Sequence, residues 1–136
     1  MDLQEPISEY MSAEPISIQQ EAELSEALTL MTQHGFRHLP VLDGNTLVGL
    51  VSERDLTLIE TLLPKEWETI AVAEAMTPNP YAVAPSTPVS EVARVMAEAK
   101  IGSAVVVDEA GAVKGIFTTN DALRTLAQAC GLATDP

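Results

Sequence analysis

The sequence is poor in the residues from which several kinds of site are built. Its 136 residues include one cysteine, Cys130, so no internal disulfide can form. Cys130 follows an apolar, helical stretch, which predicts a buried or half-buried structural thiol. The two histidines, His34 and His38, lie four residues apart without the glutamate of a zinc motif. The motifs Gly-x-Ser-x-Gly, Gly-Lys-Ser/Thr and Cys-x-x-Cys are absent as well. These absences argue against an enzyme and against a metal site.

Basic side chains are scarce too. Seven Lys and Arg stand against 20 Asp and Glu, which gives a formal net charge of -13. Binding to nucleic acid or to an anionic membrane requires a basic patch, so we expect neither as a partner. Residues 1–64 contain 11 acidic side chains and only two bases, Arg37 and Arg54, which makes these two bases stand out.

Long apolar runs are also missing. No run approaches the roughly 18 residues of a membrane span, and residues 1–6 lack the basic and apolar regions of a signal peptide. We therefore expect a soluble, cytoplasmic protein. We also expect an independent small protein rather than a piece of a longer transporter, kinase or dehydrogenase. The hydrophobic content of 46% is ample for a packed core.

The chain contains an internal repeat. It matches itself at an offset of 65 residues, which becomes 66 after one residue is inserted in a turn. The matched pairs include Met11 and Met76, Met31 and Met96, Gly49 and Gly115, and Asp55 and Asp121. We accordingly divide the chain into repeat 1 (1–63), a connector (64–71), repeat 2 (72–130) and a frayed C-terminal tail (131–136).

Each repeat is predicted to begin with a short turn, which leads through a proline-containing segment into a brief extended piece and then a helix. The turns are 7–11 and 72–76, and the extended pieces are 16–18 and 81–83. Apolar residues at i, i+3, i+4 and i+7 predict this helix, and Thr87 before Pro88 fits an N-cap followed by proline at the first helical position. The apolar residues are Leu24, Ala27, Leu28 and Met31 in repeat 1 and Val89, Val92, Ala93 and Met96 in repeat 2.

Two β-rich runs follow the helix and are predicted to form a hairpin in each repeat. The runs are 38–42 with 46–51, and 104–107 with 112–117. A closing helix comes next, from about Glu53 to Leu63 and from about Thr119 to Cys130. About 60 residues are too few to bury both faces of these elements. We therefore predict an α+β fold in which two β-α-β-β-α repeats pack sheet to sheet.

Each closing helix begins at a repeated corner, Gly49–Asp55 and Gly115–Asp121. Two interpretations fit this pattern. In the first, Ser52 or Thr118 caps the helix, the aspartate three residues later completes a capping box, and the glycine lets the strand bend. In the second, the hydroxyl and the carboxylate bind a ligand at the helix N-terminus. A single corner does not decide between them.

The corners in their wider context resemble the cystathionine-β-synthase (CBS) domain. The resemblance rests on Met-Ser or Met-Thr before a Pro-containing extended segment, on the stretch 36–43, and on Gly-apolar-apolar-Ser/Thr-x-x-Asp. It appears twice, over roughly residues 7 to 60 and 72 to 128. It implies a tandem CBS (Bateman) module with a pseudo-twofold axis and two clefts between the repeats. Such modules pair into homodimers, bind adenosine-containing ligands such as AMP, ADP, ATP or S-adenosylmethionine, and regulate a partner protein rather than catalyse.

The resemblance also implies roles for individual residues. Asp55 and Asp121 are expected to bond ribose hydroxyls, and Ser52 and Thr118 to touch the sugar-phosphate. Arg54 and Asn120 are expected to face the phosphates. Further lining residues of the Asp55 cleft are Arg37, His38, Thr77, Asn79, Pro80, Tyr81, Gly102 and Ser103. Those of the Asp121 cleft are Ser12, Ile16, Arg37, His38, Gly102 and Ser103. No catalytic residue, metal or resident cofactor is implied.

The two corners differ in charge. Repeat 2 has Gly102-Ser103 and Asn120 where repeat 1 has Arg37-His38 and Arg54, so it has no cation at a matching position. In a chain with net charge -13, a polyphosphate is disfavoured beside Asp121, and we expect phosphate in the Asp55 cleft. The alternative from a different class is an interaction or dimerisation scaffold with unoccupied clefts. Which partner is regulated stays open.

Overall fold

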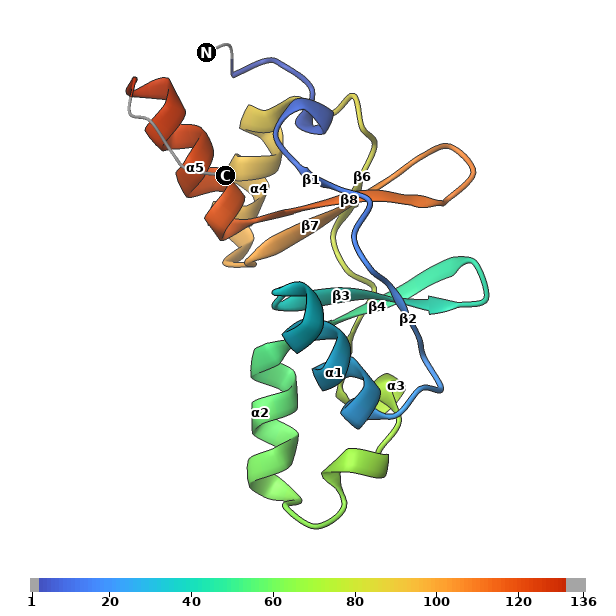
Figure 1. The fold of residues 1–136 in the computed structure, drawn as a ribbon. Coiled ribbons are helices and arrows are strands. Elements are labelled where there is room, and N and C mark those ends of the chain that lie inside the picture. The colour runs from blue at the N-terminus through green and yellow to red at the C-terminus, as the bar shows by residue number, and fades with distance from the viewer. Residues whose placement is uncertain (1–2, 132–136) are drawn as a thin grey trace. The chain divides into compact units, whose positions relative to one another are not determined.

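Two β hairpins form the centres of two separate sheets (Figure 1). In the computed structural model, which describes residues 3–131, β3 (His38–Asp43) pairs with β4 (Thr46–Ser52), and β7 (Ser103–Val107) pairs with β8 (Val113–Thr118). Both pairings are antiparallel, so the predicted hairpins are confirmed. The predicted α+β class is confirmed as well, because the sheets are four-stranded and accompanied by helices.

Each sheet is completed by a strand from the other sequence repeat. β5 (Thr77–Pro78) runs antiparallel to β4, and β1 (Ser12–Ala13) runs antiparallel to β8. Two short parallel strands close the opposite edges, β2 (Ile18–Gln19) beside β3 and β6 (Ala82–Val83) beside β7. The strand orders are therefore β2-β3-β4-β5 and β1-β8-β7-β6.

This exchange of edge strands divides the chain into two compact units that differ from the sequence repeats. The first unit spans Ile16–Pro80, and the second combines the described residues up to Pro15 with those from Tyr81 onward. The frayed tail is expected at 131–136, and residues 132–136 of it lie outside the described part of the chain.

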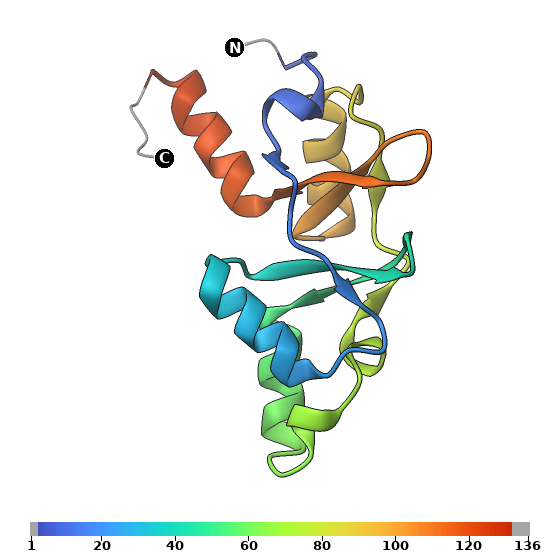
Figure 2. The same ribbon diagram turned by 45° about the vertical axis from the view of Figure 1, so that its right-hand side comes forward.

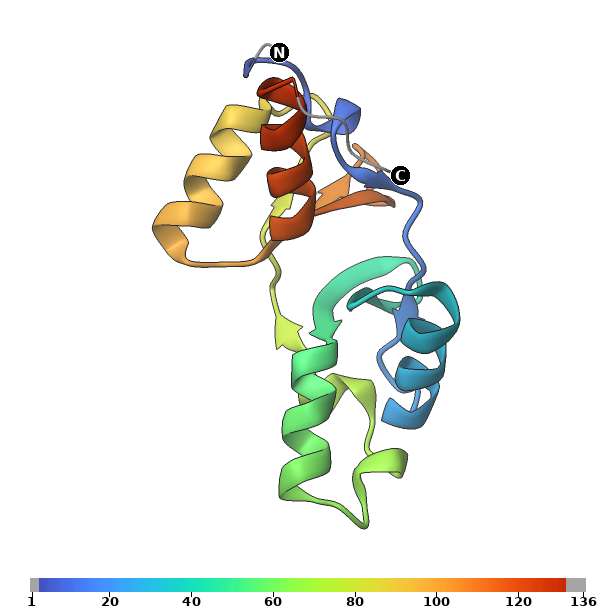
Figure 3. The same ribbon diagram turned by 60° about the vertical axis from the view of Figure 1, so that its left-hand side comes forward.

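The helices begin and end close to the predicted positions. The four long ones are α1 (Leu24–His34), α2 (Glu53–Leu62), α4 (Val89–Ala99) and α5 (Thr119–Ala129). The short ones are η1 (Ile7–Glu9), η2 (Trp67–Thr69) and α3 (Val72–Ala75). Figures 2 and 3 show that α1 and α2 lie on one face of the first unit's sheet, and that α4 and α5 lie on one side of the second unit's sheet. Among the residues described, no helix combines the length and apolarity needed to cross a membrane.

The predicted helix faces supply the cores. α1 buries Leu24, Ala27 and Met31 in a cluster with residues of β3 and β4, and α4 buries Val89, Val92 and Met96 with residues of β7 and β8. The i+4 positions, Leu28 and Ala93, stay exposed in both copies. The buried stripe is therefore narrower than the apolar spacing predicts.

Two predictions at helix ends are wrong. Thr87 does not cap α4: the N-cap residue is Pro88, which has extended backbone angles and makes no side-chain cap. The Thr87 carbonyl instead accepts a hydrogen bond of 2.7 Å from the Ile7 N–H, which holds the segment in a turn. Cys130 is exposed rather than buried, because its apolar neighbours on α5 are open to solvent as well: Leu126, one turn earlier, is 59% exposed.

The glycine of each repeated corner is required by a close approach rather than by a bend. A Cβ atom on Gly49 would lie 2.9 Å from Met76 Cγ and 3.0 Å from the carbonyl oxygen of Thr77. On Gly115 it would lie 2.8 Å from Met11 Cγ. Each methionine immediately precedes the exchanged edge strand, so the missing side chain lets that strand pair with the hairpin.

We expect Gly49→Ala to lower the free energy of unfolding by about 1–3 kcal/mol, because the added methyl group overpacks the contact with the Met76–Thr77 segment. Urea-induced unfolding followed by circular dichroism measures the change. Gly102→Ala is the control, since a Cβ there meets nothing nearer than Thr119 Oγ1 at 3.7 Å. Equal unfolding midpoints for the two variants would contradict the role given to Gly49.

Candidate functional site

The repeated corners are complete capping boxes in both units. At the start of α2, Ser52 Oγ accepts a hydrogen bond of 3.1 Å from the Asp55 N–H, and Asp55 Oδ2 accepts one of 2.8 Å from the Ser52 N–H. At the start of α5, the Asp121 N–H donates to Thr118 Oγ1 (3.4 Å) and the Thr118 N–H donates to Asp121 Oδ2 (2.9 Å). The capping interpretation is thus confirmed for both corners. It uses one oxygen of each carboxylate.

The second carboxylate oxygen distinguishes the corners. Asp121 Oδ1 accepts hydrogen bonds from Ser12 Oγ and from Arg124 Nη1, both of 3.1 Å, and Asp121 is only 4% exposed. Asp55 is half-buried, and no hydrogen bond from residues 3–131 reaches its Oδ1. Asp55 therefore keeps an acceptor for an incoming hydroxyl group, whereas Asp121 already has internal partners.

The exchanged strand brings further predicted site residues to the sheet of the Asp55 corner. Thr77 pairs with Leu50 of β4, and the Asn79 N–H donates to the Val48 carbonyl at 3.3 Å. Asn79 has φ = 51°, a left-handed conformation that asparagine tolerates better than most residues. Thr77, Asn79 and Pro80 therefore belong to the same compact unit as Asp55.

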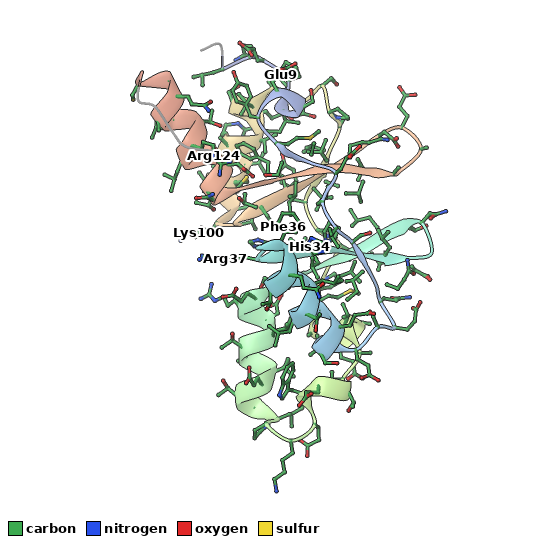
Figure 4. All side chains as sticks on the ribbon, in the orientation of Figure 1. Glu9, His34, Phe36, Arg37, Lys100 and Arg124 are labelled. Carbon is green, nitrogen blue, oxygen red and sulfur yellow. The ribbon has the colours of Figure 1, made fainter. Side chains whose placement is uncertain are left out.

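The start of β3 places bases beside the Asp55 corner. The Arg37 carbonyl accepts a hydrogen bond of 2.8 Å from the Glu53 N–H, and His38 pairs with Ser52 across the hairpin. Arg37 and Arg54 are exposed, and neither joins a salt bridge within the described part of the chain. Figure 4 shows Arg37 beside Phe36, in the turn between α1 and β3. The corner thus has two cations available for an anion, next to the N-terminus of α2.

His38 is held neutral. Burial lowers the pKa of its imidazole, the Asp55 carboxylate acts in the opposite direction, and the Arg37 charge adds to the lowering. The side chain is therefore an uncharged hydrogen-bonding group near neutral pH, not a third cation.

The second corner has the same backbone without these bases. The Gly102 carbonyl accepts from the Thr119 N–H at 3.0 Å, and Ser103 pairs with Thr118. Asn120 is exposed at the position of Arg54. Ser12, from the exchanged strand β1, contacts Asp121 directly.

Arg124 is the residue that the sequence comparison missed. It lies one turn into α5, and its counterpart in repeat 1 is Leu58. An acidic residue followed three positions later by a basic one on the same helix predicts such a pair.

The remaining predicted site residues are divided between the units. Ile16 packs against the core of the first unit. Arg37, His38 and Asp55 belong to the same unit. Tyr81 packs against the core of the second unit, and burial raises the pKa of its hydroxyl, with the Glu91 charge adding to the effect. Lining of one corner by residues of the other unit remains a prediction. Within residues 3–131, no group of three His, Cys, Asp or Glu side chains is placed to hold a metal ion.

Comparison with known proteins gives a consistent family. A model of the CBS domain matches residues 7–59 and 72–128. Inosine-5'-monophosphate dehydrogenase of Korarchaeum cryptofilum is 33% identical over 112 residues, which are 82% of this chain and 22% of the enzyme. The chloroplastic CBS domain-containing protein CBSX2 of Arabidopsis thaliana is 30% identical over 132 residues, 77% of this chain and 56% of that protein. The chain thus spans less than two thirds of the length of these relatives.

Two solved structures are similar over nearly their whole length. A crystal structure of CBSX2 in complex with AMP has a TM-score of 0.78 at 30% identity, covering 93% of this chain and 98% of that one. The CBS domain pair of protein MJ0100, in complex with 5'-methylthioadenosine and S-adenosyl-L-methionine, has a TM-score of 0.79 at 27% identity, covering 91% of this chain and 97% of that one.

The lowered pKa of His38 predicts a loss of stability in acid. The folded protein binds a proton at His38 more weakly than the unfolded chain does, because the folded-state pKa is lowered. The folded state therefore loses stability as the pH falls below the unfolded pKa of His38, near 6.5. We expect the decrease in unfolding free energy between pH 7 and pH 5 to be smaller in His38→Gln than in the wild type. Urea unfolding at a series of pH values measures it.

His34→Gln is the matched control, because His34 is exposed at the end of α1. The difference between the pH profiles of the three proteins isolates the contribution of His38, because it subtracts the acid response that they share. An identical acid response in wild type and His38→Gln would contradict the burial effect.

Proposed function

The chain belongs to the CBS domain family, and on that premise we propose that it is a regulatory module that binds an adenosine-containing nucleotide of the AMP, ADP or ATP class. The observation that carries the proposal is the Asp55 corner, where a half-buried carboxylate oxygen accepts no hydrogen bond from residues 3–131. Two arginines that form no salt bridge within those residues, Arg37 and Arg54, belong to the same corner at the N-terminus of α2. The AMP complex of CBSX2 and the S-adenosyl-L-methionine complex of MJ0100 support this ligand class.

Each group of the corner has a chemical role in the proposal. Asp55 Oδ1 accepts a hydrogen bond from a ribose hydroxyl, which is the donor that a carboxylate binds well. Arg54 and Arg37 balance the charge of a phosphate, and the partial positive charge at the N-terminus of α2 adds to the attraction. Neutral His38 offers a hydrogen bond without adding charge. A phosphate here meets cations in a chain that is otherwise strongly acidic.

The proposed activity is sensing rather than catalysis. Occupancy of the site stabilises one conformation, and a partner protein responds to the shift in population. The similarity to inosine-5'-monophosphate dehydrogenase concerns 22% of that enzyme and does not extend its chemistry to this chain.

We expect Asp55→Asn to weaken binding of AMP by about 10–100-fold, because a hydrogen bond to a charged group contributes about 1.5–3 kcal/mol. Asparagine can still accept from the Ser52 N–H, so the helix cap is retained. Calorimetric titration with AMP, ATP and S-adenosylmethionine measures the affinity. Asp43→Asn, at the far end of the same hairpin, makes the same change in net charge and should bind as the wild type does. No binding of any of the three ligands at millimolar concentration would sink the proposed function.

Exposed leucines favour a second role, in dimerisation. Leu58 and Leu62 on α2 are 57% and 64% exposed, and Leu123 and Leu126 on α5 are 60% and 59% exposed. Their i, i+4 and i, i+3 spacings place each pair on one helix face. Exposed apolar faces of this kind mark protein interaction surfaces. We propose that they contact a second copy of the chain, and this scaffold role does not require a ligand.

We expect the double variant Leu62→Gln and Leu126→Gln to sediment as a monomer under conditions where the wild type sediments as a dimer, because amides in place of leucines weaken an apolar interface. Sedimentation velocity over a range of concentrations distinguishes the two masses. Leu28→Gln, a leucine on α1 that is 37% exposed, is the control and should remain dimeric. A wild type that is monomeric at every concentration would rule out the proposed interface.

A further inference from the structure

The carboxylate of Asp121 has no capacity left for a ligand. A carboxylate offers about four acceptor positions. Four donors already occupy Asp121: Ser12 Oγ and Arg124 Nη1 bond Oδ1 at 3.1 Å, while the N–H and Oγ1 of Thr118 bond Oδ2 at 2.9 and 3.2 Å. At 4% exposure the residue is also shielded from solvent.

Only one of those four bonds, from the N–H of the N-cap residue, has an equivalent at Asp55 in the described chain, and Ser52 Oγ does not donate to Asp55 as Thr118 Oγ1 does to Asp121. Leu58 stands where Arg124 stands in the other repeat, and its side chain cannot donate a hydrogen bond. Thr77 matches Ser12, yet no hydrogen bond joins it to Asp55 within the described chain. The two corners therefore share the capping box and differ in what occupies the second oxygen.

Arg124 is the donor that a ribose would have to displace. Its guanidinium forms a charge-assisted hydrogen bond with Asp121, and such bonds are roughly twice as strong as neutral ones. A ribose offers only neutral hydroxyl groups in exchange. Solvent screens part of the pair, because the Arg124 side chain is 42% exposed. The exchange stays unfavourable even so, because the Asp121 carboxylate is buried and would lose its one cationic partner. Figure 4 shows Arg124 on α5.

We infer that Arg124 acts as a built-in substitute for a ligand that closes the Asp121 corner, so that the Asp55 corner alone takes the ribose of an adenosine-type ligand. The inference rests on the proposed function and adds to it a residue that determines which corner binds. Removing Arg124 should open the second corner, and placing an arginine at its counterpart, Leu58, should close the first.

Exchanging the two residues between the repeats tests the inference. The assay is titration of uniformly ¹⁵N-labelled protein with AMP and with adenosine, observed through the backbone amides of Ser52 and Asp55 for one corner and of Thr118 and Asp121 for the other. Adenosine is included because it carries no phosphate. The second corner has no base at the positions that Arg37 and Arg54 occupy in the first corner. In the wild type we expect shifts at the first pair only. In Arg124→Leu we expect adenosine to shift both pairs.

In Leu58→Arg, the affinity at the first corner should fall at least about tenfold, the equivalent of about 1.4 kcal/mol. Two controls separate the pair from general effects. Arg94→Leu removes an arginine of the same unit that pairs with Glu98 on α4, so it makes the same change in net charge and should leave the second corner closed. Leu58→Gln disturbs the exposed leucine face of α2 as Leu58→Arg does but supplies no cation, so the difference in affinity between these two variants measures the effect of the guanidinium.

The possible failures are distinct. Shifts at both corners in the wild type would overturn this inference and leave the proposed function standing. Shifts at neither corner, with any probe, would overturn both. Binding by the wild type at the first corner, combined with an Arg124→Leu variant whose second corner still does not respond to adenosine, would show that Arg124 is not what closes it. The ion pair is also tested without any ligand, by measuring hydrogen exchange of the Arg124 guanidinium group. We expect its protection from exchange to be lost in Asp121→Asn and kept in Asp55→Asn.

Discussion

An aspartate at the third position of a helix has two oxygens, and in each unit the helix uses one of them. The bond from the N-cap N–H to this oxygen satisfies a backbone donor that would otherwise lack a partner, and it fixes the direction in which the helix leaves the sheet. The other oxygen is not needed for folding. The two repeats differ in the partners of this second oxygen, and on that difference rests our proposal that one corner binds a ligand and the other is only a cap.

The exchange of edge strands is a second constraint, and it acts on the same corners. Each hairpin accepts the outermost strand from the other sequence repeat, which requires the segment before that strand to cross directly over a glycine. The exchange carries Ser12 to Asp121 and Thr77 to the sheet that contains Asp55. Fold and site are coupled because the strand that completes each sheet also brings a hydroxyl residue to it.

Much of this arrangement was predictable because it follows local periodicity. The β-rich runs define the hairpin strands to within one residue, and the closing helices predicted at about 53–63 and 119–130 end one residue earlier than expected. The 3.6-residue spacing identifies the other two long helices but not their last residues. The errors share a cause: they concern contacts that a local pattern does not contain. Thr87 is bound through its carbonyl by Ile7, 80 positions earlier, which a capping rule cannot detect. Cys130 is exposed because no described element covers this end of α5, where Leu126 is 59% exposed, and apolar neighbours in the sequence do not reveal that.

Arg124 shows the limit of comparing repeats position by position. Repeat 2 has no base at the positions where repeat 1 has Arg37, His38 and Arg54. The relevant base lies where repeat 1 has a leucine, and it faces inward to the aspartate rather than outward to a ligand. Divergence of this kind costs little stability, because the capping box that holds each helix remains intact whether or not the second oxygen is free. One corner can therefore give up ligand binding while the fold is unchanged. Because cations are scarce in this acidic chain, our proposal assigns a phosphate to the corner whose arginines form no salt bridge within the described residues.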